Sequence, residues 1–167
     1  MSFPHLDELV AGATFAEEPA PREKLFLRAM REVAQFHFDH CPAYRKLCEA
    51  RDFDPNSQWG LADLPYVPTS LFKDALLLSV PEDKVFREIK SSATTSGRSS
   101  RVGLDRATSM RQSKCFNKVV MDRLGAERRK FIVLDDPSTL LRTEVVSARA
   151  STIRSLLFVA SDAQPCF

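Results

Sequence analysis

Residues 91–101 read SSATTSGRSSR, and they lie between two segments whose residue pattern is typical of β-strands. The segment before them, 85–90 (VFREIK), alternates apolar and charged side chains, as a half-buried strand does. The segment after them, 100–104 (SRVGL), continues directly as a short strand rather than as a helix. The stretch therefore predicts a strand, a hydroxyl-rich loop and a second strand, in an arrangement like a hairpin.

The composition of this loop suits an anion. Hydroxyl and backbone N–H groups are compact hydrogen-bond donors, arginine adds a fixed positive charge, and phosphate oxygens need several donors converging on one small volume. The loop is not a Walker A motif, because it holds a single glycine, Gly97, with no lysine after it. We interpret the stretch as a phosphate clamp. A Ser/Thr-rich turn without a ligand is the alternative that the loop alone leaves open.

The rest of the chain divides into a helical part and an α/β part. Residues 1–75 are expected to be mainly helix and loop, with helices at 5–11, from 21 to about 41, and at 43–50. Residues 76–167 are expected to form an α/β segment that contains the phosphate loop, further strands at 76–80 and 130–134, and helices from 105 to 124 and from 148 to 160. Strand and helix in alternation after residue 99 predict an α/β fold with a largely parallel sheet.

Charge is distributed unevenly along the chain. The formal net charge is +2, but residues 1–90 carry −4 and residues 91–167 carry +6. The positive half begins at the hydroxyl-rich loop, which favours an anionic ligand there, although an acidic partner would also suit it. A nucleic-acid partner is not expected, because no helix-turn-helix, zinc-finger or RNA-recognition signature is present.

Hydropathy and cysteine usage indicate a cytoplasmic protein. No apolar run approaches the length that a membrane span needs, and the N-terminus lacks the basic and apolar regions of a signal peptide. Reduced thiols are expected, since there is no Cys-x-x-Cys pair. The four cysteines are Cys41, Cys48, Cys115 and Cys166.

Weaker candidates lie outside the loop. His37 and His40 have a spacing that metal sites use, but no third ligand is evident, so no metal site is predicted. Lys73 is either an anion contact or a solvated lysine. Asp135 and Asp136 follow the expected strand at 130–134, where α/β proteins place functional groups, but Asp-Pro-Ser is also ordinary turn chemistry.

Five segments, in order along the chain, resemble the acyl-protein synthetase (LuxE) family of the acyl-adenylate-forming superfamily. They are 40–45 (HCPAYR), 63–73 (DLPYVPTSLFK), 91–97 (SSATTSG) with 100–105 (SRVGLD), 133–138 (VLDDPS) and 147–149 (SAR). The resemblance covers about residues 37–155. It implies that residues 1–167 form a single, incomplete domain, which corresponds to the N-terminal portion of the large domain of an adenylate-forming enzyme.

The resemblance also implies a chemistry. Members of the family use ATP and Mg²⁺ to convert a fatty acid, or another carboxylic acid, into an acyl-adenylate. They pass the acyl group to a cysteine thiol and onward to an acyl reductase partner. The family's phosphate loop corresponds here to Ser91, Ser92, Thr94, Thr95, Ser96 and Gly97. Arg98 and Arg101 are added to this set on charge alone, and no catalytic residue is identified.

One position departs from the family's pattern. Ala93 stands where the family usually has glycine, and if the backbone there needs a positive φ, alanine costs on the order of 1 kcal/mol. Family members are also longer than this chain. Both points leave a second hypothesis open, in which the chain is a non-catalytic module that binds a nucleotide or a protein partner.

Overall fold

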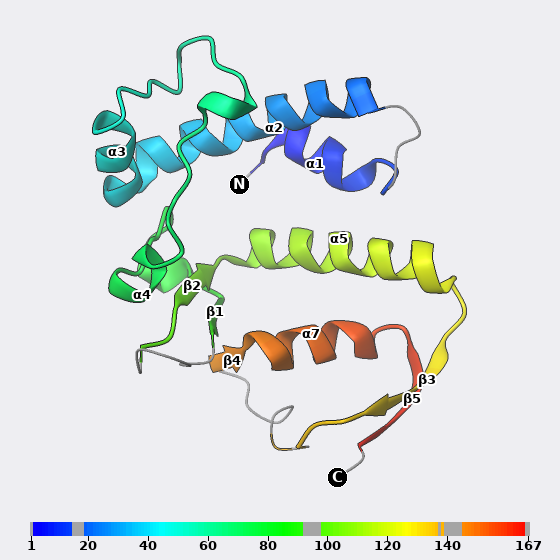
Figure 1. Ribbon diagram of the computed structural model, residues 1–167. Coiled ribbons are helices and arrows are strands. Elements are labelled where there is room, and N and C mark those ends of the chain that lie inside the picture. Colours follow the sequence, from blue (N-terminus) through cyan, green and yellow to red (C-terminus); the bar gives the residue numbers. More distant parts are fainter. Residues whose placement is uncertain (1, 15–18, 92–97, 137, 139–144, 166–167) are drawn as a thin grey trace. The chain divides into compact units, whose positions relative to one another are not determined.

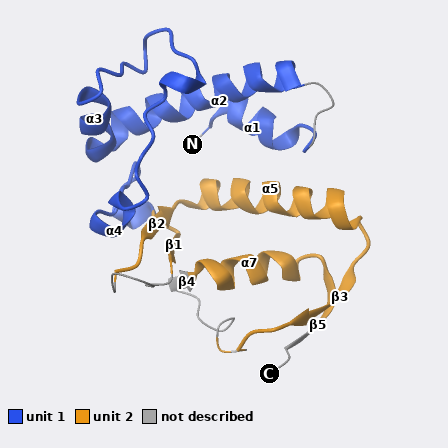
Figure 2. Cartoon of the chain, in the orientation of Figure 1, with its two compact units in different colours: residues 1–84 blue, residues 85–167 orange. Residues whose placement is uncertain are grey.

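The computed structural model describes residues 2–14, 19–91, 98–136, 138 and 145–165 (Figure 1). Contacts within the chain divide it into two compact units, Met1–Lys84 and Val85–Phe167 (Figure 2). The expected change from helical to α/β character between residues 75 and 76 therefore falls inside the first unit.

The first unit is helical. Its elements are α1 (Pro4–Ala11), α2 (Pro19–His40), α3 (Pro42–Glu49), the 3-10 turn η1 (Leu61–Asp63), α4 (Leu71–Asp74) and the 3-10 turn η2 (Glu82–Lys84). The helices predicted near the N-terminus, before Pro42 and after it are confirmed, although α2 starts two residues before the expected Pro21. Proline begins α1 and α3, where its missing N–H has no partner to lose.

A carboxylate from α2 caps the beginning of α1. The backbone N–H groups of His5 and Leu6 donate to the carboxylate of Glu32 at 3.1–3.2 Å, and His5 Nδ1 lies 2.6 Å from Glu32 Oε1. Phe3, the residue before α1, makes no side-chain cap of its own. Glu32 therefore satisfies donors that the helix would leave without a partner, and it fixes α1 against α2.

The core of the first unit forms around one indole ring. Trp59 is buried, and its ring meets that of Phe53 edge-on with centroids 5.3 Å apart. Its Nε1–H donates to Pro55 O at 3.0 Å, and the Arg31 guanidinium lies over its ring. These contacts fix the irregular segment after α3 against α2. The buried cluster comprises Ala34, Cys48, Phe53 and Trp59.

The prediction of a strand at residues 76–80 is wrong. These residues continue from α4 as irregular chain and are half-buried. An apolar run such as LLLSV indicates burial, but a strand also needs a neighbouring strand for its backbone groups. Here the segment is held by a side chain instead, since Ser79 Oγ lies 2.5 Å from His37 Nδ1 on α2.

The second unit combines short strands with two helices. Its elements are β1 (Arg87–Lys90), β2 (Arg101–Leu104), α5 (Arg106–Leu124), β3 (Arg129–Val133), β4 (Val145–Ser147), α7 (Ala148–Leu157) and β5 (Ala160–Pro165). The strands form a three-stranded sheet in the order β2-β1-β4 and a parallel pair, β3 and β5. Within the first sheet β1 is antiparallel to β2 and parallel to β4. The α/β character is confirmed, but the described strands form two small sheets rather than one.

Local capping signals set the bounds of α5. The carboxylate of Asp105 accepts a hydrogen bond from Thr108 N at 2.6 Å, and Gly125 follows the helix with a φ of 85°. Both features agree with the predicted helix from 105 to 124. Figure 1 shows α5 and α7 lying alongside each other.

The final helix is shorter than predicted. The sequence pattern extends to Ala160, whereas α7 ends at Leu157. The chain then enters β5, whose first residue, Ala160, pairs with Arg129 of β3. Pairing with a distant strand thus overrides a local helical pattern.

Candidate functional site

The predicted strands on either side of the phosphate loop pair as a hairpin. In β1 and β2, Arg87 is opposite Leu104 and Lys90 is opposite Arg101. Antiparallel partners of this kind hold the two ends of the connecting loop close together. The loop from 92 to 97 lies outside the described residues.

Two serines close the base of this loop. Ser91 N donates to Ser100 O at 3.1 Å, and Ser100 N donates to Ser91 Oγ at 2.9 Å. The Ser91 hydroxyl therefore accepts a hydrogen bond within the protein, and a hydroxyl that accepts still carries its own proton to donate. Ser91 fixes the point from which the loop leaves the sheet.

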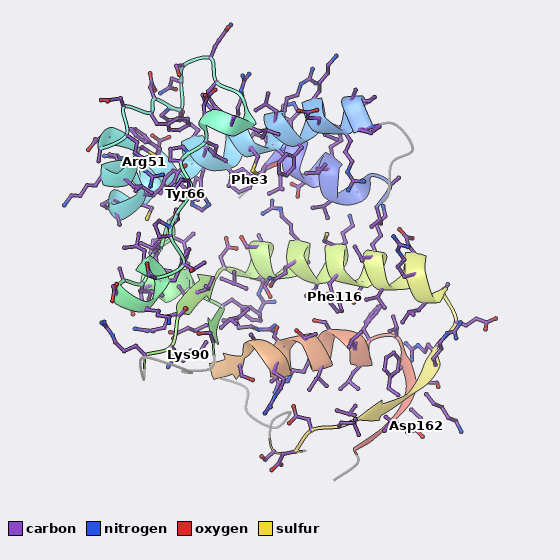
Figure 3. The ribbon with its side chains drawn as sticks, viewed as in Figure 1. Phe3, Arg51, Tyr66, Lys90, Phe116 and Asp162 are labelled. Atoms are coloured by element: carbon purple, nitrogen blue, oxygen red, sulfur yellow. The ribbon has the colours of Figure 1, made fainter. Side chains whose placement is uncertain are left out.

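The two faces of the hairpin differ in character. Alternate residues of a strand share a face, and so do directly opposed residues of paired strands. Glu88, Lys90 and Arg101 therefore share one face, while Arg87 and Ile89 share the other. The latter pair lines a cavity of about 240 Å³ together with side chains of α5 and α7, among them Phe116, which Figure 3 labels. The face with Arg87 and Ile89 is directed toward α5 and α7, and the opposite face carries Glu88, Lys90 and Arg101.

On the face that carries Glu88, Lys90 and Arg101, the carboxylate of Glu88 contacts both cations. Glu88 Oε1 lies 2.8 Å from Arg101 Nε, and Glu88 Oε2 lies 3.0 Å from Arg101 Nη2. Lys90 Nζ is 3.6 Å from Glu88 Oε1. The hydrogen bond from Arg101 outweighs the effect of burial and lowers the pKa of Glu88. The Glu88 side chain is 19% exposed, less than either of its cationic partners. These three residues are called the Glu88 cluster below.

The structure places only part of the predicted site. Ser91 follows β1, Arg101 is the first residue of β2, and Arg98 is exposed on the approach to β2. Ser92, Thr94, Thr95, Ser96 and Gly97 lie outside the described residues, so their contact with phosphate stays a prediction. Glu88 was not predicted from the sequence as a neighbour of Arg101. The charge alternation in residues 87–90 places Glu88 and Lys90 on one face, and the hairpin register places Glu88 diagonally across from Arg101.

Two other segments of the family resemblance meet in the second unit. Asp135, just after β3, pairs with Arg149 at the start of α7, with Arg149 Nε 2.8 Å from Asp135 Oδ2. Asp136 accepts a backbone hydrogen bond from Ser138 at 2.8 Å, and this bond lowers its pKa. Asp136 thus has the turn role that the sequence left open, and Asp135 links β3 to α7.

The histidines of α2 have other partners. His40 Nδ1 is 2.9 Å from Phe36 O, and its ring stacks on Phe36. Burial and the nearby His40 lower the pKa of His37, whose Nδ1 faces Ser79. Among the described residues, no group of three or more His, Cys, Asp or Glu side chains is arranged to hold a metal ion.

The cysteines are free thiols where they are described. Cys41 and Cys48 are buried, Cys115 on α5 is exposed, and Cys166 lies outside the described residues. No helix in the described part of the chain has the length and apolar character needed to cross a membrane.

The fold is similar to that of a CoA ligase of known structure. The chain is similar to 2-hydroxyisobutyryl-CoA ligase in an open conformation, in complex with 2-HIB-AMP and CoA, with a TM-score of 0.68 and 18% identity over 92% of this chain and 37% of that one. The postadenylation state of the same ligase gives a TM-score of 0.70 and 18% identity, over 91% of this chain and 32% of that one. The fold is therefore similar to part of an adenylate-forming CoA ligase, and the chain spans about a third of those structures.

Sequence comparisons agree with this fold. A long-chain-fatty-acid–luciferin-component ligase of Photorhabdus luminescens is 37% identical over 92 residues, which is 55% of this chain and 74% of the relative. A phenylacetate-coenzyme A ligase of Thermus thermophilus is 33% identical over 120 residues, 65% of this chain and 25% of that ligase. The family described as acyl-protein synthetase, LuxE, matches residues 2–164. Since this match covers nearly the whole chain, the protein belongs to the acyl-protein synthetase (LuxE) family.

Proposed function

We propose that this chain provides the nucleotide-binding part of a cytoplasmic, ATP-dependent ligase that activates a fatty acid as an acyl-adenylate. The observation that carries the proposal is the family match over residues 2–164. The hairpin supports it, because Ser91 and Ser100 bring together the two ends of a loop whose sequence is rich in hydroxyl donors. The similarity to ligase structures that hold an acyl-adenylate points to the same chemistry.

The reaction begins at the α-phosphate of ATP. An oxygen of the substrate carboxylate forms a bond to the α-phosphorus, the bond from that phosphorus to the bridging α–β oxygen breaks, and pyrophosphate leaves. Charge moves onto the leaving pyrophosphate, so donors that are already in place around it stabilise the transition state. The hydroxyl and N–H groups of residues 91–97 have this role in the proposal, with Arg98 and Arg101 supplying positive charge.

Magnesium accompanies the nucleotide in this proposal. Mg²⁺ is commonly bound by substrate phosphates, waters and one or two carboxylates, and it needs no cage made only of protein groups. In the structure both carboxylate oxygens of Glu88 face Arg101, and Glu88 is not assigned as a magnesium ligand. Mg²⁺ would neutralise charge on the phosphates, while the loop orients them.

Two further steps follow from the family. The acyl group passes to a cysteine thiolate, so that a bond between sulfur and the carbonyl carbon forms while AMP leaves. A nucleophile of an acyl reductase partner then forms a bond to the carbonyl carbon, the bond from that carbon to the cysteine sulfur breaks, and the cysteine thiolate is released. The name of the relative from Photorhabdus luminescens, a long-chain-fatty-acid–luciferin-component ligase, indicates a long-chain fatty acid as the substrate class. No cysteine of this chain is assigned to the transfer.

A nucleotide-binding module without turnover is the second candidate. It is favoured by Ala93, which stands where the family usually has glycine and carries a Cβ that glycine lacks. Such a module binds ATP through the same loop but forms no acyl-adenylate.

Exchange of labelled pyrophosphate into ATP separates these candidates. The full chain, and a version extended to the length of its family, are incubated with ATP, Mg²⁺ and labelled pyrophosphate, with and without a long-chain fatty acid. The ligase predicts exchange that depends on the fatty acid. If neither protein shows exchange, the proposed ligase function is overturned. If the chain binds ATP but shows no exchange, the second candidate, a nucleotide-binding module without turnover, is supported.

A further inference from the structure

The Glu88 cluster lies where the phosphate loop joins the sheet. Lys90 is the last residue of β1 and Arg101 is the first residue of β2, and the two are directly opposite each other. The next pair outward is Ser91 with Ser100, which closes the loop. Two cations and one carboxylate therefore lie near the ends of the two strands that the loop connects, on the hairpin face opposite the α5 and α7 cavity.

The register explains how one carboxylate reaches both cations. Glu88 is opposite Gly103, which has no side chain to cover that part of the face. The Arg101 side chain extends diagonally into this space and presents Nε and Nη2 to the two carboxylate oxygens. Lys90 is two residues along on β1, and its Nζ lies 3.6 Å from the same Oε1 that Arg101 Nε contacts. Glu88 is thus the shared anion of the cluster.

A carboxylate and a phosphate compete for these donors. Both bind a guanidinium through paired oxygens, and both attract an ammonium group. If a phosphate group approaches Arg101 while Glu88 remains in place, the two anions repel each other at short range. A phosphate that contacts the cluster must therefore displace the carboxylate or bind more weakly because of it.

We propose that Glu88 is a resident counter-ion of Arg101 and Lys90, and that a phosphate group of ATP takes its place when the nucleotide binds. This inference rests on the proposed nucleotide-binding function. Glu88 then lowers the affinity for ATP, keeps the cations ordered in the free protein, and returns to them when pyrophosphate leaves. The opposite role, in which Glu88 holds Arg101 ready for phosphate, predicts that the loss of Glu88 weakens ATP binding.

Calorimetric titration with ATP and Mg²⁺ distinguishes these roles. We expect Glu88→Gln to bind ATP about three- to tenfold more tightly than the wild type, because the competing charge is gone and surface charges are only partly screened. Asp83→Asn is the matched control, since it removes one negative charge from the exposed pair with Lys84, and its affinity should not change. Arg101→Gln should weaken binding about tenfold and should abolish the gain from Glu88→Gln in the double variant.

A second measurement uses only the wild-type protein. The NMR signal of Arg101 Nε–H, assigned with Arg101→Gln, should move as ATP saturates the protein, because this donor exchanges a carboxylate for a phosphate. The Nε–H of Arg149, also 2.8 Å from a carboxylate, is the internal control and should stay in place.

The outcomes separate this inference from the proposed function. If the wild type binds ATP but Glu88→Gln binds it equally or more weakly, the counter-ion role is wrong and the nucleotide-binding function stands. If Glu88→Gln does not fold, an Arg101 signal that ATP leaves unchanged overturns the inference, and a saturable shift supports it. If the wild type binds no ATP, both are overturned.

Discussion

Arg149 Nε lies 2.8 Å from Asp135 Oδ2 and joins the start of α7 to the turn after β3. The Asp135 side chain is 8% exposed, whereas that of Arg149 is 71% exposed. An almost buried carboxylate is thus neutralised by a cation that reaches it from the surface. The pair connects residues 133–138 with residues 147–149, two segments on which the family resemblance depends.

Removing Arg149 should destabilise the second unit. In Arg149→Ala, Asp135 loses its ion pair with Arg149. We expect a loss of about 1 kcal/mol in the free energy of unfolding, because the exposed guanidinium is partly screened by solvent. Urea unfolding followed by circular dichroism measures this. Arg128→Ala, at an exposed position before β3, should change the stability by less than about 0.5 kcal/mol. Equal unfolding of the two variants would contradict the linking role.

Glu32→Gln should destabilise the first unit at neutral pH. The neutral amide cannot match a carboxylate that accepts hydrogen bonds from His5 and Leu6, and we expect a cost of about 1–2 kcal/mol. Trp59, the sole tryptophan, lies in this unit, so its fluorescence reports the unfolding. Glu23→Gln, an exposed position on α2, is the matched control.

The stability difference between the wild type and Glu32→Gln should depend on pH. Burial of Glu32 opposes its ionisation, but hydrogen bonds from His5 and Leu6 outweigh burial and lower its pKa below the ordinary 4.5. The folded state therefore binds fewer protons at this group than the unfolded state. Its contribution is complete above about pH 4.5 and is lost as the pH falls through the lower pKa of the folded state. The difference between the wild type and Glu32→Gln should shrink over that acid range. A difference that stays constant there would show that the charge of Glu32 is unimportant.

Gly125→Ala should shorten or destabilise α5 through the backbone alone. Gly125 has a φ of 85°, a conformation that disfavours a Cβ, yet an added Cβ would have no atom within 4 Å. We expect a cost of about 1 kcal/mol. Gly60→Ala is the comparison, since Gly60 has a φ of −100° and its Cβ would meet Asp63 Oδ2 at an ordinary 3.7 Å. If both variants unfold alike in urea, the positive φ is not what requires glycine at residue 125.

Elements with local signals could be predicted from the sequence. Asp105 and Gly125 set the ends of α5, and the alternation in residues 85–90 predicted β1. Elements that depend on distant partners could not be predicted. In β5 the residues ASDAQP carry no β-branched side chain, and they become a strand only because β3 lies beside them. Residues 76–80 show the converse, since they have a strand's composition and no paired strand in the described structure.

Some features of the candidate site could likewise be predicted from adjacent residues, whereas others depend on contacts between distant residues. The loop and its flanking strands could be located from hydroxyls, glycine and charge, which are features of adjacent residues. The role of Glu88 depends on a diagonal contact with Arg101, which only the register of β1 against β2 defines. The link between Asp135 and Arg149 likewise requires the three-dimensional placement of β3 and α7.

The most direct measurement is a calorimetric titration with ATP and Mg²⁺ of the wild-type chain and of the double variant Thr95→Ala/Ser96→Ala. If these two hydroxyls bind a charged phosphate, the variant should lose at least about tenfold in affinity for ATP. The double variant Ser151→Ala/Thr152→Ala, which removes the same two groups from α7, should bind as the wild type does. If the wild type binds no ATP, or if the loop variant binds as well as the wild type, residues 91–97 do not hold the nucleotide.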